Sequence, residues 1–181
     1  MFQKIKPSSF RWYITGSLLK PSQKDESLLK IRSIADYQFG RGAGVSLFPK
    51  SVRIKLSPTT GKVRHVYLKG KLLATLRPTD GLFGLTVEGA KRLLKTFKSP
   101  RLRVVVAGDI EEFIRAGRSV FAKHVKVADP NIRPRDEVVV TNSRDEVLAV
   151  GRAVLAGCEM SLFRLGVAVK VRHGSHSNCE A

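Results

Sequence analysis

The sequence predicts an α+β protein with two domains, a small mixed domain followed by a mostly antiparallel β-barrel. In the first domain a helical repeat, several strands with alternating side chains and a second helical repeat follow one another. In the second domain, short β-branched runs separated by turn-forming residues recur, which is typical of a small closed barrel. Because Ser99-Pro100 ends the second helical repeat, we place the domains at residues 1–99 and 100–174, with a tail at residues 175–181.

The first domain reads as a helix, a set of strands and a second helix. Apolar residues at helical spacing, such as Leu28, Ile31 and Ala35, predict the first helix over residues 23–38. The glycine-rich segment 40–44 favours a turn over a phosphate cradle, because it lacks the Lys-Ser/Thr ending of a nucleotide-binding loop. The remaining predicted elements are strands over residues 52–56, 63–67 and 72–78, a short apolar strand over 82–86, and a helix over 87–97.

The strands of both domains show the alternation expected of half-buried sheets. Arg53 and Lys55 alternate with Val52, Ile54 and Leu56, which predicts a strand with a cationic outer face. In the second domain we expect a strand over residues 103–106, a helix over 109–116, strands near 119–127, 136–141, 146–154 and 167–172, and a helical turn near 159–164.

The charge of the chain is strongly positive. Thirty-three Lys and Arg face 15 Asp and Glu, for a net charge of +18 and a pI near 10.5. Residues 1–99 hold 20 basic and 5 acidic side chains, whereas residues 100–181 hold 13 and 10. A Lys- and Arg-rich surface adapted to high temperature would bring matching Glu, which this chain lacks. The imbalance therefore favours a polyanionic partner, attracted mostly by the first domain.

Several classes of function lack any signal in the sequence. The two cysteines, Cys158 and Cys179, lie too far apart for a disulfide framework or a cysteine zinc site, and we expect neither a metal nor a cofactor. No Ser–His–Asp set or carboxylate pair has catalytic spacing, so we expect no catalytic residue. No apolar run is long enough for a membrane span or a signal peptide, so we expect a cytoplasmic protein without a membrane partner.

Cations and apolar residues interleave at two places in the second domain. The segment after the helix over 109–116 begins with Gly117 and carries Arg118, Phe121, Lys123 and His124. The closing strand places Lys170 and Arg172 on one face and valines on the other. Such surfaces either hold a phosphate backbone or are ordinary solvated strand faces, and Phe121 is either a stacking platform or a core residue. Taken together, the set favours binding.

These blocks resemble a known family. FAK-ADP-IRP-DEV, LAVGRA and EM-GVAVKVRHG are similar to the PUA domain that ends archaeosine tRNA-guanine transglycosylases. ADYQFGRGAG (35–44), TTGKVRHVYL (59–68), LLATLRPTDGL (72–82) and LTVEGAKRLL (85–94) resemble the domain that precedes PUA in those enzymes. The catalytic barrel of the family, with its aspartate nucleophile and zinc site, would lie before residue 1. The resemblance therefore implies tRNA binding and does not imply base exchange by this chain.

The resemblance also implies which residues contact RNA. The PUA part would grip the tRNA acceptor stem and its 3′ end through Gly117, Arg118, Phe121, Lys123, His124, Lys170 and Arg172. The preceding domain would contact the RNA backbone through Arg53, Lys55, Lys62, Arg64, Lys69 and Arg77. A dispersed cationic surface suits RNA helices, which are recognised by shape and by phosphate and 2′-hydroxyl contacts.

Our interpretation is an RNA-binding protein that binds tRNA as an accessory or targeting module for tRNA modification. One alternative is a non-catalytic subunit of a split tRNA-guanine transglycosylase, whose catalytic subunit is encoded separately. A second alternative is a ribosome-associated translation factor with a PUA domain. The transglycosylase-type segments of the first domain favour the first two interpretations over the third.

Overall fold

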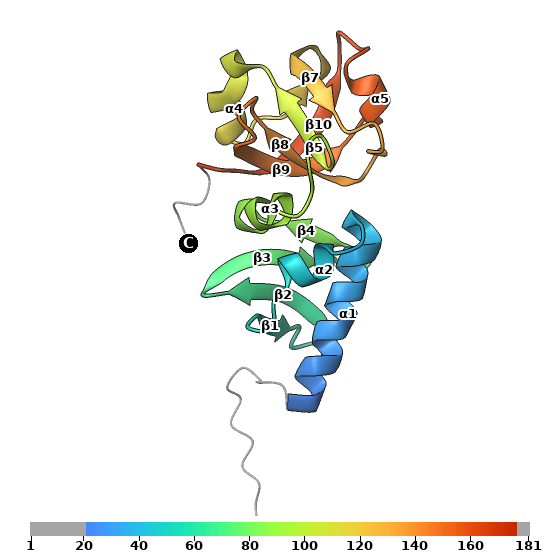
Figure 1. Cartoon of the computed structure of the whole chain (residues 1–181), viewed down its shortest axis with the longest axis vertical. Helices are drawn as coiled ribbons and strands as arrows, with labels where there is room; N and C mark the ends of the chain where they lie inside the picture. Colours follow the sequence, from blue (N-terminus) through green and yellow to red (C-terminus); the bar gives the residue numbers. More distant parts are fainter. Residues whose placement is uncertain (1–20, 177–181) are drawn as a thin grey trace, which may run out of the picture.

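The computed structural model describes residues 21–176, so the first 20 residues of the predicted first domain and most of the predicted tail lie outside the described residues. Two parts are stacked along the long axis of the molecule (Figure 1). The first part contains a four-stranded sheet with three helices, and the second is a six-stranded barrel-like sheet. Helix α3 (Val87–Leu94) lies between the two (Figure 1). The observed class is the predicted one, α+β with a mostly antiparallel barrel.

The first part follows the predicted order of elements, with one helix added. Its antiparallel sheet has the order β1-β2-β3-β4. Helix α2 occupies the end of the glycine-rich segment, where only a turn was predicted. Gly44 allows this helix to pack on α1, because a Cβ there would lie 2.4 Å from the Arg32 carbonyl oxygen. The elements are α1 (Pro21–Phe39), α2 (Ala43–Leu47), β1 (Arg53–Leu56), β2 (Val63–Leu68), β3 (Lys71–Leu76), β4 (Phe83–Leu85) and α3, which ends three residues earlier than predicted.

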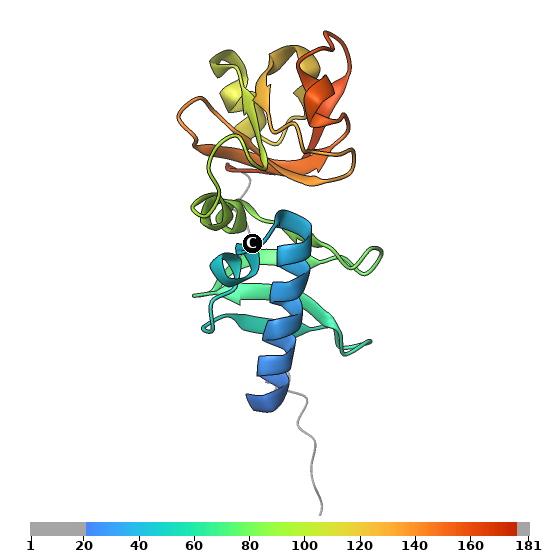
Figure 2. The ribbon, with the colours of Figure 1, turned by 45° about the vertical axis from the view of Figure 1, so that its right-hand side comes forward.

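The four-stranded sheet has one buried and one open face. Ile54, Val66, Ala74 and Leu85 are cross-strand neighbours, and all four belong to the hydrophobic core shared with the helices. Helices α1 and α2 both lie on this side of the sheet (Figure 2). Because side chains alternate along a strand, the neighbouring rows point away from the helices. The opposite face carries the rows Lys55–His65–Thr75–Gly84 and Arg53–Tyr67–Leu72.

The second part is a sheet whose two edges are joined by one chain segment. The strand order is β6-β10-β9-β8-β5-β7, antiparallel except for the parallel pair β5 and β8. The elements are β5 (Arg103–Val106), η1 (Gly108–Ile110), α4 (Glu111–Arg115), β6 (Val120–Phe121), η2 (Ala122–His124), β7 (Val125–Ala128), β8 (Glu137–Thr141), β9 (Val147–Ala153), α5 (Gly157–Met160) and β10 (Val167–Gly174).

The single strand predicted near residues 119–127 is wrong in detail. The short helix η2 divides it into β6, which pairs with β10, and β7, which pairs with β5. A straight strand could not pair with both edges of the sheet, so the break at η2 is what nearly closes the barrel. The helical turn predicted near 159–164 lies earlier, at α5.

The hydrophobic core of the first part extends onto the outside of the barrel, whose interior holds a second core. Val139, Val147 and Val150 lie on the outside of the barrel and belong to the same buried cluster as the residues of the first part. Leu85 of β4 donates its backbone N–H to Glu137 Oε1 at 2.8 Å, which adds a polar contact beside the apolar ones. The first part is therefore packed directly against β8 and β9.

Candidate nucleic-acid interface

The segment after α4 presents most of its predicted residues to solvent. Gly117 ends the helix with φ of 91°, a backbone conformation that favours glycine. Arg118 and Lys123 are exposed, and neither side chain has a polar partner within residues 21–176. Phe121 is 50% exposed, so it is not a core residue. His124 lies apart from these cations, with Nδ1 3.9 Å from Asp109 Oδ2.

The two cations predicted on the closing strand β10 have different surroundings. Lys170 is exposed and has no polar partner within the described part of the chain. Arg172 donates from Nη2 to the Leu85 carbonyl oxygen at 3.0 Å and forms an ion pair with the buried carboxylate of Glu137. Arg172 therefore joins the two parts of the molecule, a role that the sequence prediction did not include.

The predicted cations of the first part also fall into two groups. Arg53 and Lys55 are exposed on the edge strand β1, Lys62 and Lys69 are exposed in turns, and Arg64 is half-buried on β2. Arg77 is held by Asp80, with Nη2 3.0 Å from Oδ2, and its Nη1 lies 3.6 Å from Glu137 Oε2. Burial raises the pKa of the Glu137 carboxyl, and the charges of Arg172 and Arg77 oppose that effect.

The open face of the four-stranded sheet continues onto the barrel. A Cβ on Gly84 would lie 2.7 Å from Arg172 Nη1, so the row that begins at Lys55 ends against this guanidinium. Lys170 lies directly opposite Arg152 of β9, and Arg152 is in turn the cross-strand neighbour of Glu137, the residue that Arg172 contacts. Strand β6 then borders β10 and leads to Phe121. We call this surface the cationic face, and its charged members are Arg53, Lys55, Arg77, Arg152, Lys170 and Arg172.

Two carboxylates, Asp80 and Glu137, pair with three members of this surface, Arg77, Arg152 and Arg172. Residues 37–79 contain nine Lys and Arg and no Asp or Glu. Of the nine, Lys71 and Arg77 have ion-pair partners within the described residues, at Glu88 and at Asp80 and Glu137. On the C2 side of the face, Arg53 and Lys55 can attract a polyanion without competition from internal ion pairs within the described residues, whereas on the barrel side Arg152 and Arg172 are paired with Asp80 and Glu137.

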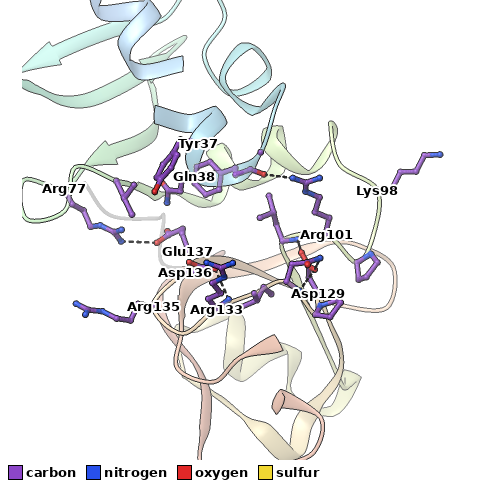
Figure 3. A pocket seen from close by; sticks show the side chains of 18 residues that line it. Tyr37, Gln38, Arg77, Lys98, Arg101, Asp129, Arg133, Arg135, Asp136 and Glu137 are labelled. Carbon is purple, nitrogen blue, oxygen red and sulfur yellow. Dashed lines mark hydrogen bonds and ion pairs between the residues drawn. The ribbon is translucent and has the colours of Figure 1, made fainter. Parts of the chain in front are cut away.

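A cleft of about 880 Å³ lies between the end of α1, the connection to the barrel and the loop before β8. Arg77 reaches toward Glu137 in its wall, while Lys98 and Arg135 lie at opposite ends of the view (Figure 3). Tyr37 on its rim is 86% exposed. Of these residues only Arg77 was predicted from the sequence, although the two arginines that flank Pro134 were a signal for Arg135.

The acidic residues near this cleft have structural partners. Asp129 Oδ2 accepts the backbone N–H of Leu102 at 2.8 Å, and its Oδ1 accepts that of Asn131 at 2.9 Å. Within residues 21–176, no group of three or more His, Cys, Asp or Glu side chains could hold a metal ion. In the same part of the chain, no helix has the length and apolar character needed to cross a membrane.

Comparison with known proteins identifies both parts. Residues 29–100 match the family model of the patch-forming domain C2 of tRNA-guanine transglycosylase, and residues 102–175 match that of the PUA domain. The chain carries a C2 domain followed by a PUA domain. The resemblance predicted from the sequence is thereby confirmed.

The curated relatives of this C2–PUA chain include archaeal proteins named tRNA-guanine(15) transglycosylase. It is 50% identical over 152 residues to the tRNA-guanine(15) transglycosylase of Thermococcus kodakarensis, covering 84% of this chain and 26% of that protein. It is 43% identical over 173 residues to the enzyme of the same name from Thermoplasma volcanium, covering 95% of this chain and 27% of that protein. The chain thus spans about a quarter of the length of these relatives.

Solved structures share the fold at lower sequence identity. A hypothetical protein from Pyrococcus horikoshii superposes with a TM-score of 0.69 and 23% identity, covering 84% of this chain and 92% of that one. A PUA-domain protein from Thermoplasma acidophilum gives a TM-score of 0.58 and 21% identity, covering 83% and 89% of the two chains. At these identities the likeness concerns the fold alone.

Proposed function

We propose that this C2–PUA protein binds tRNA at the acceptor stem and 3′ end and serves as a non-catalytic module in tRNA modification. The observation that carries the proposal is the cationic face, which extends from the edge strand β1 of the C2 domain to β10 of the PUA domain. The relatives are named as tRNA-guanine transglycosylases, which supports tRNA as the RNA. Residues 1–99 and 100–174 would be the two domains, and RNA would contact both.

Within this proposal the exposed cations without partners bind the phosphates. Arg118, Lys123 and Lys170 would hold the acceptor end, and Arg53 and Lys55 would hold the backbone further along. Arg77 and Arg172 contribute charge to the same surface while their guanidinium groups stay on Glu137. Phosphate contacts of this kind make affinity fall steeply with salt.

The experiment measures tRNA affinity at several salt concentrations for the wild type and for the double variant Lys123→Glu/Lys170→Glu. The matched control is Lys24→Glu/Lys30→Glu, which makes the same charge change at exposed positions of α1. We expect the first pair to weaken binding and the control pair to leave most of it intact. If both double variants lost the same amount of tRNA affinity, the loss would depend on net charge alone. That result would contradict the assignment of Lys123 and Lys170 to the RNA-binding surface.

Comparing intact tRNA with tRNA that lacks its 3′ end locates the contact. Weaker binding to the trimmed molecule is expected for an acceptor-end binder. Equal binding to both would leave a general cationic surface and would favour a ribosome-associated factor, which should then prefer small ribosomal subunits to free tRNA.

A second candidate function is that of one subunit of a two-chain enzyme. This chain matches about a quarter of each relative, and the catalytic part would in this case be encoded separately. The chain would then be the tRNA-binding subunit of a split transglycosylase. Base exchange that requires mixing this protein with a separately purified catalytic subunit would support the idea, and exchange by that subunit at the same rate without it would contradict it.

A further inference from the structure

The open face of the C2 sheet carries two aromatic side chains next to each other. His65 and Tyr67 lie two residues apart on β2, with ring centroids separated by 6.2 Å and ring planes inclined by 55°. Both are half-buried, and the core face of the same strand is occupied by Val66. Helices α1 and α2 cover only that core face (Figures 1 and 2).

Each of these rings faces a cation on the edge strand. Arg53 is the cross-strand neighbour of Tyr67, and Lys55 is the neighbour of His65. Both cations are exposed, and neither has a polar side-chain partner within residues 21–176. Cross-strand neighbours are about 5 Å apart, so a ring and a cation on this face can contact the base and the phosphate of one nucleotide.

His65 is held in place and favours the neutral form. Its Nδ1 lies 3.2 Å from Thr75 Oγ1 on β3. Burial lowers the pKa of the imidazole, and the charges of Arg64 and Lys55 lower it further. A neutral imidazole with one nitrogen engaged by Thr75 offers a flat ring without adding to the surrounding positive charge.

We propose that Tyr67 and His65 form a stacking platform for successive bases of a single-stranded RNA segment, whose phosphates lie on Arg53 and Lys55. This proposal rests on the RNA-binding function proposed above and names the form of RNA that the C2 domain takes. Bases in a duplex are stacked on one another and cannot reach an aromatic ring, whereas unpaired bases can. Stacking on aromatic rings tolerates any base, so the platform recognises an unpaired segment and not a sequence.

The test compares three probes with equal phosphate charge: a short oligouridylate, an abasic oligonucleotide of the same length and an RNA duplex. For the wild type we expect oligouridylate to bind more tightly than the abasic strand. Tyr67→Ala should weaken oligouridylate binding about tenfold and leave binding of the abasic strand unchanged, because only the base contact is lost. Tyr67→Phe should retain the wild-type affinity, since the ring remains.

Phe113→Ala is the matched control, because Phe113 is an exposed aromatic residue on α4, outside the open face of the sheet and outside the cleft. Tyr67→Leu repeats the test with an apolar side chain that preserves packing on the half-buried Leu72 beside it, in case the alanine variant unfolds. Loss of oligouridylate affinity in Tyr67→Leu but not in Phe113→Ala supports the platform.

Two further outcomes separate this proposal from the function on which it rests. If the wild type binds tRNA but does not distinguish oligouridylate from the abasic strand, the platform is wrong and the RNA-binding function stands. If the wild type binds neither tRNA nor any of the three probes, the RNA-binding function itself fails.

Discussion

Arg103 and Asp145 are joined by two hydrogen bonds, from Nε to Oδ1 at 2.6 Å and from Nη2 to Oδ2 at 2.9 Å. Arg103 is only 2% exposed, and it also donates to the carbonyl oxygens of Arg101 at 2.9 Å and Leu94 at 3.2 Å. Leu94 is the last residue of α3, and Asp145 lies in the turn between β8 and β9. One guanidinium therefore fastens the last helix of the C2 domain to the PUA barrel.

This arrangement predicts strong coupling between the two residues. Arg103→Met leaves two carbonyl oxygens without a donor, and Asp145→Asn leaves a buried guanidinium without its anion, so each should lower the free energy of unfolding by about 2 kcal/mol. The double variant should cost less than the sum, with a coupling of about 1 kcal/mol in urea denaturation. Arg115 and Glu146 are the control pair, since they meet at 3.4 Å on a more exposed surface and should show almost no coupling. Additive losses for Arg103 and Asp145 would contradict the role assigned to the pair.

Contacts of this kind explain why part of the candidate site could not be predicted. Arg172 was expected to face solvent because of the alternation along the closing strand, and Arg77 was expected to contact RNA because of the family resemblance. Their partner, Glu137, lies far along the chain and becomes buried only when the two domains pack together. Local patterns thus identified the strands and their cationic sides. Which arginines form ion pairs with Glu137 depends on the packing between the domains, which no local pattern contains.

The lowered pKa of His65 predicts that the stability of the protein depends on pH. The pKa of His65 in the folded protein is lower than the ordinary value of 6.5, chiefly through burial and then through Arg64 and Lys55. The folded state therefore binds the proton less readily than the unfolded state, so stability is lowest below the folded pKa and rises with pH to its full value above about 6.5. His65→Gln should remove part of this rise, measured by urea denaturation across that range. His173→Gln serves as a comparison, because burial and Arg172 also lower the pKa of His173. A wild-type profile that is flat through this window would contradict the prediction.

Replacing Lys170 is expected to change the salt dependence of tRNA binding. A lysine that binds one phosphate contributes about 0.9 to the slope of log affinity against log salt concentration. Lys170→Ala should therefore reduce the slope by about that amount and weaken binding to all tRNAs alike. Lys91→Ala is the control, because Lys91 is exposed but lies 3.3 Å from Glu88, outside the cationic face. An unchanged slope for Lys170→Ala would remove Lys170 from the interface.

The alternation within strands was predictable, whereas the geometry that joins the elements was not. Ile54 and Val66 fall on the buried face, as a period of two requires. The division of the segment 119–127 by η2 follows from pairing with both edges of the barrel, a constraint that no local pattern contains. His65 and Tyr67 could be recognised in the sequence as two aromatic residues on one side of a strand. That this side is the open face of the sheet follows only from the position of the helices in the structure.

Gly89 is the residue for which local propensity and packing disagree. It lies inside α3, where replacing glycine by alanine would favour an isolated helix by about 1 kcal/mol. In the folded protein, however, a Cβ at this position would lie 2.1 Å from the Leu73 carbonyl oxygen on β3. Since backbone cannot move aside as a flexible side chain can, Gly89→Ala should push α3 away from the sheet and cost about 2 kcal/mol. Thermal unfolding measures the loss, and the helix also carries the contact to Arg103, so Gly89→Ala combined with Arg103→Met should be less than additive. A stabilised Gly89→Ala variant would show that α3 does not approach β3 as closely as described.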